Sequence, residues 1–180
     1  QVQLEASGAD LSVTSLANVV KGFNQQVTIR DVVATYVFPN TLQTLEVKRR
    51  VLKAGLERCA EYFALDGSGQ LQVGQSFLKP IVQHYNFDYL SGLEVTIDIR
   101  RPIGDRVTSM LYEGKELEEG RTLTLCMNIY RATGTGGYPF YAQCRLVKDQ
   151  PTEISQMIIE YIDRHKHVTV DKRKWLHVVY

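Results

Sequence analysis

The sequence lacks the features that mark several classes of protein. Its 21 basic and 20 acidic side chains nearly cancel, so no excess charge favours a nucleic-acid polymer or a membrane surface as partner. No apolar run is long enough to span a bilayer, and no signal peptide or lipidation motif opens the chain. The three cysteines, Cys59, Cys126 and Cys144, are widely spaced, which argues against a disulfide framework or a zinc site and favours buried thiols.

Motifs of hydrolytic catalysis and phosphate binding are also missing. No histidine falls in a metal-ligand pattern, and no cysteine or serine sits in a recognisable nucleophile motif. The glycine-rich segment NIYRATGTGGY, residues 128–138, does not complete the pattern G-x-G-x-x-G, because Pro139 takes the place of the last glycine. The sequence therefore predicts no self-contained catalytic site and no cofactor in this chain.

Length and composition predict one globular domain over residues 1–180, because 44% of the residues are hydrophobic. The chain opens on Gln1 rather than Met, so we expect it to be processed or cut from a longer protein. Runs of strands with few helices between them predict an α+β fold, a mixed β-sheet with flanking helices. Periodicity and caps predict helices over 28–34, 49–65 and 153–165, capped by Thr28 and Thr152 at the first and last, and strands over 2–6, 41–47, 93–99, 107–112, 123–129 and 175–179.

A candidate binding surface lies in the segment YVFPNTL, residues 36–42. Pro39 stiffens the entry to a strand, so Phe38 and Asn40 have little freedom left to lose on binding. An aromatic face beside an amide suits a purine or pyrimidine, which needs stacking for its ring and hydrogen bonds for its edge. The alternative is that Phe38 packs in the core and Asn40 caps the turn, and composition alone favours that alternative.

A second aromatic residue, Tyr130, comes at the end of a predicted strand. Small residues follow it, which would let a flat ligand lie close to the backbone. If Tyr130 faces Phe38, the two rings form a clamp. The alternative is an aromatic side chain that covers the end of the sheet, and spacing alone favours neither. Asn86 and Asp88 are expected to fix a loop through bonds from side chain to backbone.

The chain carries four distinctive segments: ASGADLS (6–12), VTIRDVVATYVFPNTLQTLEV (27–47), QHYNFDYLSGLEVTIDIRRPIGDRV (83–107) and MNIYRATGTGGY (127–138). Together they resemble the C-terminal domain of the bacterial 5'-nucleotidase family. That family includes UDP-sugar hydrolases, 2',3'-cyclic-nucleotide 2'-phosphodiesterases and multifunctional nucleotide phosphoesterases. The resemblance covers essentially the whole chain, and the order of the segments F-P-N-T, Y-N-F-D and N-x-Y-R-A-x-G-x-G-G is more specific than any one of them.

The resemblance implies a division of labour between two domains. A calcineurin-like metallophosphoesterase domain, N-terminal to this one, would hold two divalent metals and hydrolyse the phosphoester. This chain would be the domain that recognises a nucleotide or nucleoside, and relatives of this kind are exported. The implied contacts are Phe38 and Tyr130 on the two faces of the base, Asn40 on its edge, and Gly134, Gly136 and Gly137 making room for the nucleoside.

The chain also departs from the 5'-nucleotidase pattern. Residues 8–11 read GADL where that pattern has Gly-Gly-x-Arg, whose arginine helps to hold phosphate, and Gly136 stands where many nucleotidases have an aspartate. The segments Y-N-F-D and Y-R-A look more like the cyclic phosphodiesterase branch. Arg131 is a candidate phosphate contact, with a solvated or sheet-edge arginine as the alternative. The departures also favour a rival: a binding or assembly module that has lost nucleotide binding.

Overall fold

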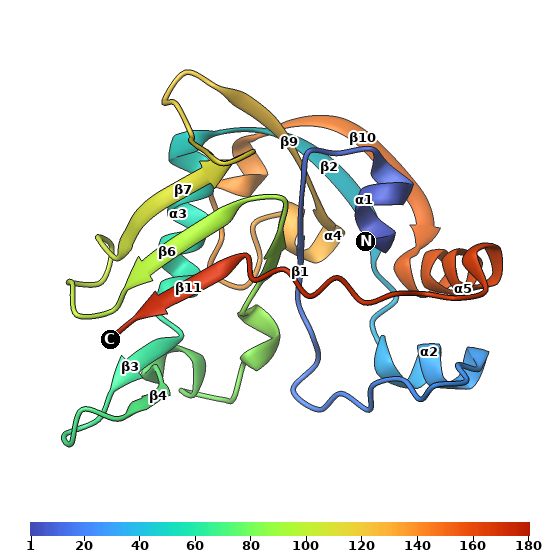
Figure 1. Ribbon diagram of the computed structural model, residues 1–180, viewed down its shortest axis with the longest axis horizontal. Coiled ribbons are helices and arrows are strands. Elements are labelled where there is room, and N and C mark those ends of the chain that lie inside the picture. The colour runs from blue at the N-terminus through green and yellow to red at the C-terminus, as the bar shows by residue number, and fades with distance from the viewer.

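The computed structural model describes residues 1–180 and is built around a five-stranded mixed sheet (Figure 1). Three of its strand pairs are antiparallel, and the pair β1–β9 is parallel. This mixed sheet with helices around it confirms the predicted α+β fold. The strand order is β10 (Arg145–Glu153), β2 (Thr41–Lys48), β9 (Thr122–Asn128), β1 (Leu11–Thr14) and β5 (Tyr89–Ser91).

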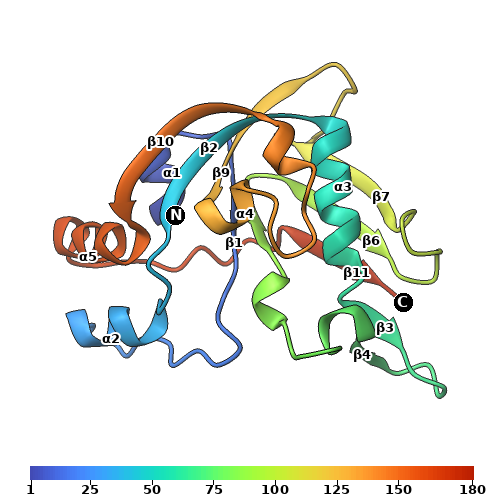
Figure 2. The ribbon, with the colours of Figure 1, turned by 180° about the vertical axis from the view of Figure 1, so that it is seen from behind.

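A second sheet and a hairpin complete the β-structure. In the second sheet β11 runs parallel to β6, and the other pairs are antiparallel. The helix α3 (Arg49–Ala60) contacts both β2 of the first sheet and β7 of the second, so it ties the two sheets together (Figure 2). The second sheet has the order β11 (Leu176–Val179), β6 (Glu94–Asp98), β7 (Val107–Tyr112) and β8 (Lys115–Glu116), and the hairpin is β3 (Phe63–Leu65) with β4 (Leu71–Val73).

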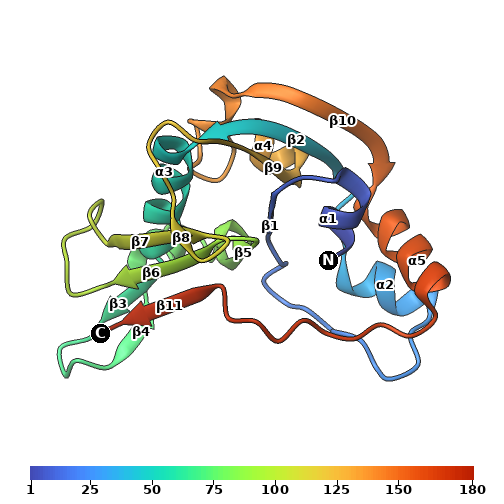
Figure 3. The same cartoon turned by 45° about the horizontal axis from the view of Figure 1, so that its top comes forward.

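The remaining long helices gather on the side of the first sheet that lies away from the second sheet (Figure 3). There α5 (Ile154–His165) contacts both α1 (Val2–Ser7) and α2 (Ile29–Thr35). A small apolar core lies beneath these helices, and a larger one fills the space between α3 and the sheets. No helix combines the length and the apolar character that crossing a bilayer requires. The short elements are α4 (Ile129–Ala132) and the 3-10 turns η1 (Gln75–Phe77), η2 (His84–Asn86) and η3 (Tyr141–Gln143).

Two of the predicted secondary-structure elements were wrong in type or in length. Residues 2–6, predicted as a strand, form α1, because Gly8 takes a left-handed conformation (φ 71°) and its N–H closes the last turn on the Leu4 carbonyl at 2.8 Å. The helix predicted over 49–65 ends at Ala60, and residues 63–65 turn into β3. The predicted strands over 41–47, 107–112 and 123–129 are confirmed to within a residue.

The segment that holds Phe38 and Asn40 is fixed at both ends. Before it, Thr28 caps α2 as predicted: the Asp31 N–H donates to Thr28 Oγ1, and the Thr28 N–H donates to Asp31 Oδ2. After it, the chain enters the central strand β2, and the Asn40 carbonyl accepts the Ile154 N–H at 2.9 Å. Helix α5 begins at Ile154, and Glu153 occupies its N-cap position. The predicted cap, Thr152, is wrong, because this residue lies in β10. The segment is thus held between α2, β2 and α5.

Candidate functional site

An open pocket of about 270 Å³ lies where the first sheet meets the segment 36–40. It brings together parts of the chain that are far apart in sequence: the residue after β1, the entry to β2, the turn η2, the end of β9, and α4. The ribbons of β2, β9 and α4 lie side by side in Figure 2. No charged side chain lines the pocket. The lining residues are Ser15, Phe38, Pro39, Asn40, Tyr85, Asn128 and Tyr130.

Three aromatic side chains form much of this lining. The sequence predicts Phe38, Asn40 and Tyr130 at one binding site. The structure places all three on the lining of the same pocket. Tyr85 is a third ring that the sequence analysis missed, although it opens the segment Y-N-F-D. All three are half-buried, and none takes part in the ring-to-ring contacts of the core. Such aromatic surface is free to stack on a flat ligand.

Polar groups make up the rest of the lining. Asn128 is only 3% exposed and Ser15 6% exposed, and Asn128 Nδ2 lies 3.5 Å from Ser15 Oγ. Tyr36, 8% exposed, lies beside the amides of Asn128 and Asn40, and its hydroxyl has no hydrogen-bond partner that meets normal geometry. Burial raises the pKa of Tyr36 to about 12, so this phenol is neutral at physiological pH. Asn128 was missed because the sequence places it inside a strand, but an asparagine directly before a helical turn is also a cap signal.

Arg131 does not face the pocket, and this corrects its prediction as a phosphate contact. The side chain is 1% exposed and is paired with Asp88, whose carboxylate oxygens lie 3.0 Å and 2.9 Å from Arg131 Nε. Its Nη1 donates to the Thr135 carbonyl at 2.8 Å, and Nη2 donates to the Tyr85 carbonyl at 3.4 Å. The guanidinium also lies 4.0 Å from the centre of the Tyr138 ring. Arg131 therefore braces the segments that carry the pocket walls.

The glycines of the turn after α4 likewise make room for protein atoms. Gly134, Gly136 and Gly137 have φ values of 88°, 78° and 93°, a region that side chains strain to enter, and none of them lines the pocket. A Cβ on Gly136 would lie 2.2 Å from Asn86 Oδ1 and 2.3 Å from Arg131 Nη1. The space beside Gly136 is filled by Asn86 and Arg131, and that beside Gly137 is filled by Arg58. These glycines therefore make room for protein atoms, whereas the prediction gave that space to a nucleoside.

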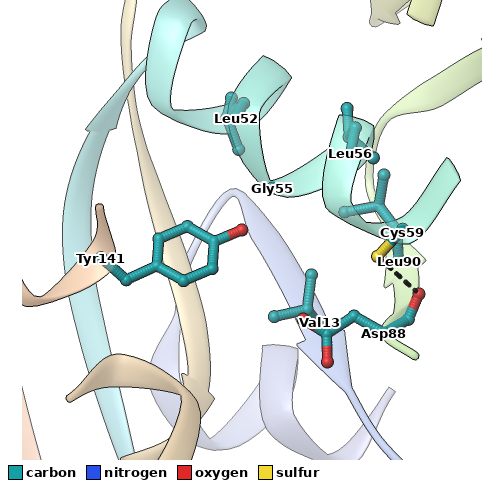
Figure 4. A pocket seen from close by; sticks show the side chains of 8 residues that line it. All are labelled: Val13, Leu52, Gly55, Leu56, Cys59, Asp88, Leu90 and Tyr141. Atoms are coloured by element: carbon teal, nitrogen blue, oxygen red, sulfur yellow. Dashed lines mark hydrogen bonds between the residues drawn. The ribbon is translucent and has the colours of Figure 1, made fainter. Parts of the chain in front are cut away.

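A second, much smaller cavity lies beside Asp88, the residue paired with Arg131, and it is too small for a ligand. Its volume is about 10 Å³, enough for one water at most, and Cys59, Asp88 and Tyr141 lie on its wall (Figure 4). Cys59 Sγ lies 3.2 Å from the Tyr138 hydroxyl, and burial raises the pKa of the thiol to about 12, which makes it unreactive. In the chain as a whole, no group of three or more His, Cys, Asp or Glu side chains is placed to hold a metal ion.

Comparison with known proteins shows the family of this chain. The family described as "5'-nucleotidase, C-terminal domain" matches residues 1–143. The chain belongs to this family. It is 37% identical to a protein from Staphylococcus aureus that is provisionally named a 5'-nucleotidase and was solved in complex with alpha-ketoglutarate. The superposition has a TM-score of 0.93 and covers 99% of this chain and 35% of that protein. A 5'-nucleotidase precursor from Thermus thermophilus shares the fold, with a TM-score of 0.73 at 20% identity over 98% of this chain and 33% of that one.

Two curated relatives are longer than this chain. The trifunctional nucleotide phosphoesterase protein YfkN of Bacillus subtilis (strain 168) is 26% identical over 156 residues, which are 78% of this chain and 10% of that protein. The 2',3'-cyclic-nucleotide 2'-phosphodiesterase/3'-nucleotidase of Haemophilus influenzae is 26% identical over 177 residues, 88% of this chain and 25% of that protein. The chain thus spans a quarter or less of these relatives.

The first prediction concerns the buried pair. Arg131→Met leaves Asp88 buried without a partner, so we expect a loss of about 3–5 kcal/mol in the free energy of unfolding, measured in urea. Asp88→Leu should cost a similar amount, and the double variant should cost clearly less than the sum. The matched control applies the same substitutions to the half-exposed pair Arg101–Asp105, where we expect a coupling below about 1 kcal/mol. Additive losses at Arg131 and Asp88 would contradict the role of the pair.

The second prediction concerns pH. Burial raises the pKa of Asp88 to about 6 from 3.8, although the Arg131 charge opposes the rise. Folding therefore favours the protonated carboxyl, and this contribution to stability is complete below about pH 4 and is lost as pH rises through about 6. Relative to Asp88→Asn, the wild-type free energy of unfolding should fall by about 3 kcal/mol across this window, measured in urea at each pH. If the difference in unfolding free energy between wild type and Asp88→Asn stays constant or rises with pH, the pKa of Asp88 is not raised and the prediction is wrong.

Proposed function

We propose that this chain is the nucleoside-recognition domain of a nucleotide phosphoester hydrolase. The observation that carries the proposal is the convergence of Phe38, Asn40 and Tyr130 on one open pocket whose lining is uncharged. A heterocycle is neutral and flat, so it suits aromatic walls and amide groups, whereas a phosphate needs cations that this pocket lacks. Stacking on an aromatic side chain is worth roughly 1–3 kcal/mol per base.

In the whole protein we propose that a calcineurin-like domain precedes this one. Its two divalent metals would supply the activation of water and the stabilisation of charge at phosphorus. This domain, residues 1–180, would contribute positioning, because a base held by its faces and edge leaves the phosphate projecting in a defined direction. The protein would be exported and act on nucleotides outside the cytoplasm. Curated relatives named as cyclic-nucleotide phosphodiesterases favour that branch of the family for the substrate.

The alternative is a binding or assembly module that has lost nucleotide binding. Two observations favour it. Residues 8–11 lack the arginine of the nucleotidase pattern, and Asp10 in that segment is occupied with β9, where its Oδ2 accepts the Thr124 N–H at 2.8 Å and hydroxyl at 2.7 Å. Arg131 is buried as well, so neither segment offers a cation to a phosphate. On this view the pocket would be a remnant.

The third prediction separates the two proposals. Calorimetric titration of the wild-type chain with adenosine, cytidine and their monophosphates should show saturable binding of at least one of these ligands. The double variant Phe38→Ala, Tyr130→Ala should bind that ligand at least about 30-fold more weakly, because both stacking surfaces are gone. Val37→Ala, at an exposed neighbour outside the pocket, is the control and should bind as wild type. Absence of wild-type binding, or equal binding by the double variant, would favour the module.

A further inference from the structure

The amide of Asn128 has an orientation that the backbone fixes. Asn128 is the last residue of β9 and caps the short helix α4, where its Oδ1 accepts the Arg131 backbone N–H at 2.8 Å. Of the two polar atoms of an asparagine amide only the oxygen can accept a hydrogen bond, so the side-chain oxygen of Asn128 must point at the Arg131 N–H. The nitrogen, Nδ2, then points the other way, toward Ser15 and the pocket that both residues line.

This nitrogen has hydrogen-bonding capacity to spare. An amide nitrogen carries two N–H groups. The protein groups beside Asn128 Nδ2 are Ser15 Oγ, at the long distance of 3.5 Å, and the Tyr36 hydroxyl, which makes no hydrogen bond of regular geometry. Buried donors in folded proteins are nearly always satisfied, and Asn128 is 3% exposed. The neighbouring Tyr36 hydroxyl is a second buried polar group without a regular partner. Unmet polar capacity on the wall of an open pocket points to a ligand that supplies the missing partner.

We infer that Asn128 is a specificity-determining residue of the pocket, a fixed hydrogen-bond donor that requires an acceptor on the edge of the bound heterocycle. The inference rests on the proposed nucleoside function and adds to it a group that reads the base. Asn40 differs in this respect: its side chain lies beside the Tyr36 hydroxyl and caps no helix, so its amide can turn to offer either a donor or an acceptor. Asn128 cannot turn without losing the cap of α4.

The capping role gives an unusually clean test, because aspartate and serine cap helices about as well as asparagine. Asn128→Asp keeps an oxygen for the Arg131 N–H and replaces the donor toward the pocket with a second acceptor. Asn128→Ser keeps the cap and withdraws the donor. Asn24→Asp is the matched control, since it makes the same change of charge at an exposed residue outside the pocket.

The fourth prediction is measured by calorimetric titration of adenosine, inosine, cytidine and uridine. Within each purine or pyrimidine pair, donors and acceptors exchange places on the base edge. The nucleoside that binds wild type most tightly should lose at least about tenfold in affinity in Asn128→Asp and severalfold in Asn128→Ser. The order of the four nucleosides should also change in Asn128→Asp, while Asn24→Asp keeps both affinity and order.

The outcomes separate this inference from the proposed function. If the wild-type chain binds none of the four nucleosides, the proposed function fails and the inference fails with it. If wild type binds but both Asn128 variants keep its affinities, or weaken all four nucleosides equally with their order unchanged, the function stands and Asn128 is only a cap. Thermal unfolding of each variant checks that the cap is retained. Asn128→Ser should unfold within about 2 °C of wild type, whereas Asn128→Asp should unfold at a lower temperature, because it places a carboxylate at a position that is only 3% exposed.

Discussion

The buried ion pair between Arg131 and Asp88 is the constraint on which the pocket depends. It joins α4, which carries Tyr130, to the loop that directly follows η2, the turn that carries Tyr85. The same guanidinium holds the glycine turn through the Thr135 carbonyl and the loop through the Tyr85 carbonyl. Two charges removed from water cost several kcal/mol each unless they are paired and hydrogen-bonded. Arg131 and Asp88 are paired with each other, and the carbonyls that accept from the rest of the guanidinium belong to the segments that build two walls of the site.

That arrangement separates the support of the pocket from its lining. The charges and the glycines with positive φ lie behind the walls, and the walls themselves carry aromatic rings, amides and hydroxyls. An uncharged lining of this kind discriminates by shape, by stacking and by the pattern of donors and acceptors, because it has no net charge with which to attract a phosphate. The fixed amide of Asn128 and the adjustable amide of Asn40 would then share the reading of the base edge. On the proposed function, phosphate recognition would fall to another part of the whole protein.

The sequence predicts this site in part, and the physical reasons differ between residues. Phe38, Asn40 and Tyr130 were predicted together because a proline-stiffened strand entry and a strand end followed by small residues are local signals. Arg131 was misplaced because its neighbour Asp88 lies 43 positions away, and nothing local shows that an arginine will be buried. The three glycines were assigned to a ligand because sequence shows that a turn needs space, but not which atoms fill that space.

The fold was predictable to a similar degree. The central strands and the helices α2, α3 and α5 follow from their periodicity, although α3 is shorter than expected. The prediction of a strand over 2–6 was wrong, because alternation over five residues also places residues 2 and 6 on one face of a helix. The left-handed conformation of Gly8 ends a helix and so decides between strand and helix. Strand β10 was missed because its residues are almost all exposed, so it shows no apolar alternation. It is specified by pairing with β2 at the edge of the sheet.

A crystal structure of the chain with its tightest-binding nucleoside tests the central claim most directly. We predict a heterocycle between Phe38 and Tyr130, with an acceptor atom of its edge within hydrogen-bond distance of Asn128 Nδ2 and the pair Arg131–Asp88 unchanged behind it. A nucleoside bound elsewhere on the surface, or Arg131 drawn out of its pair to contact the ligand, would contradict the account.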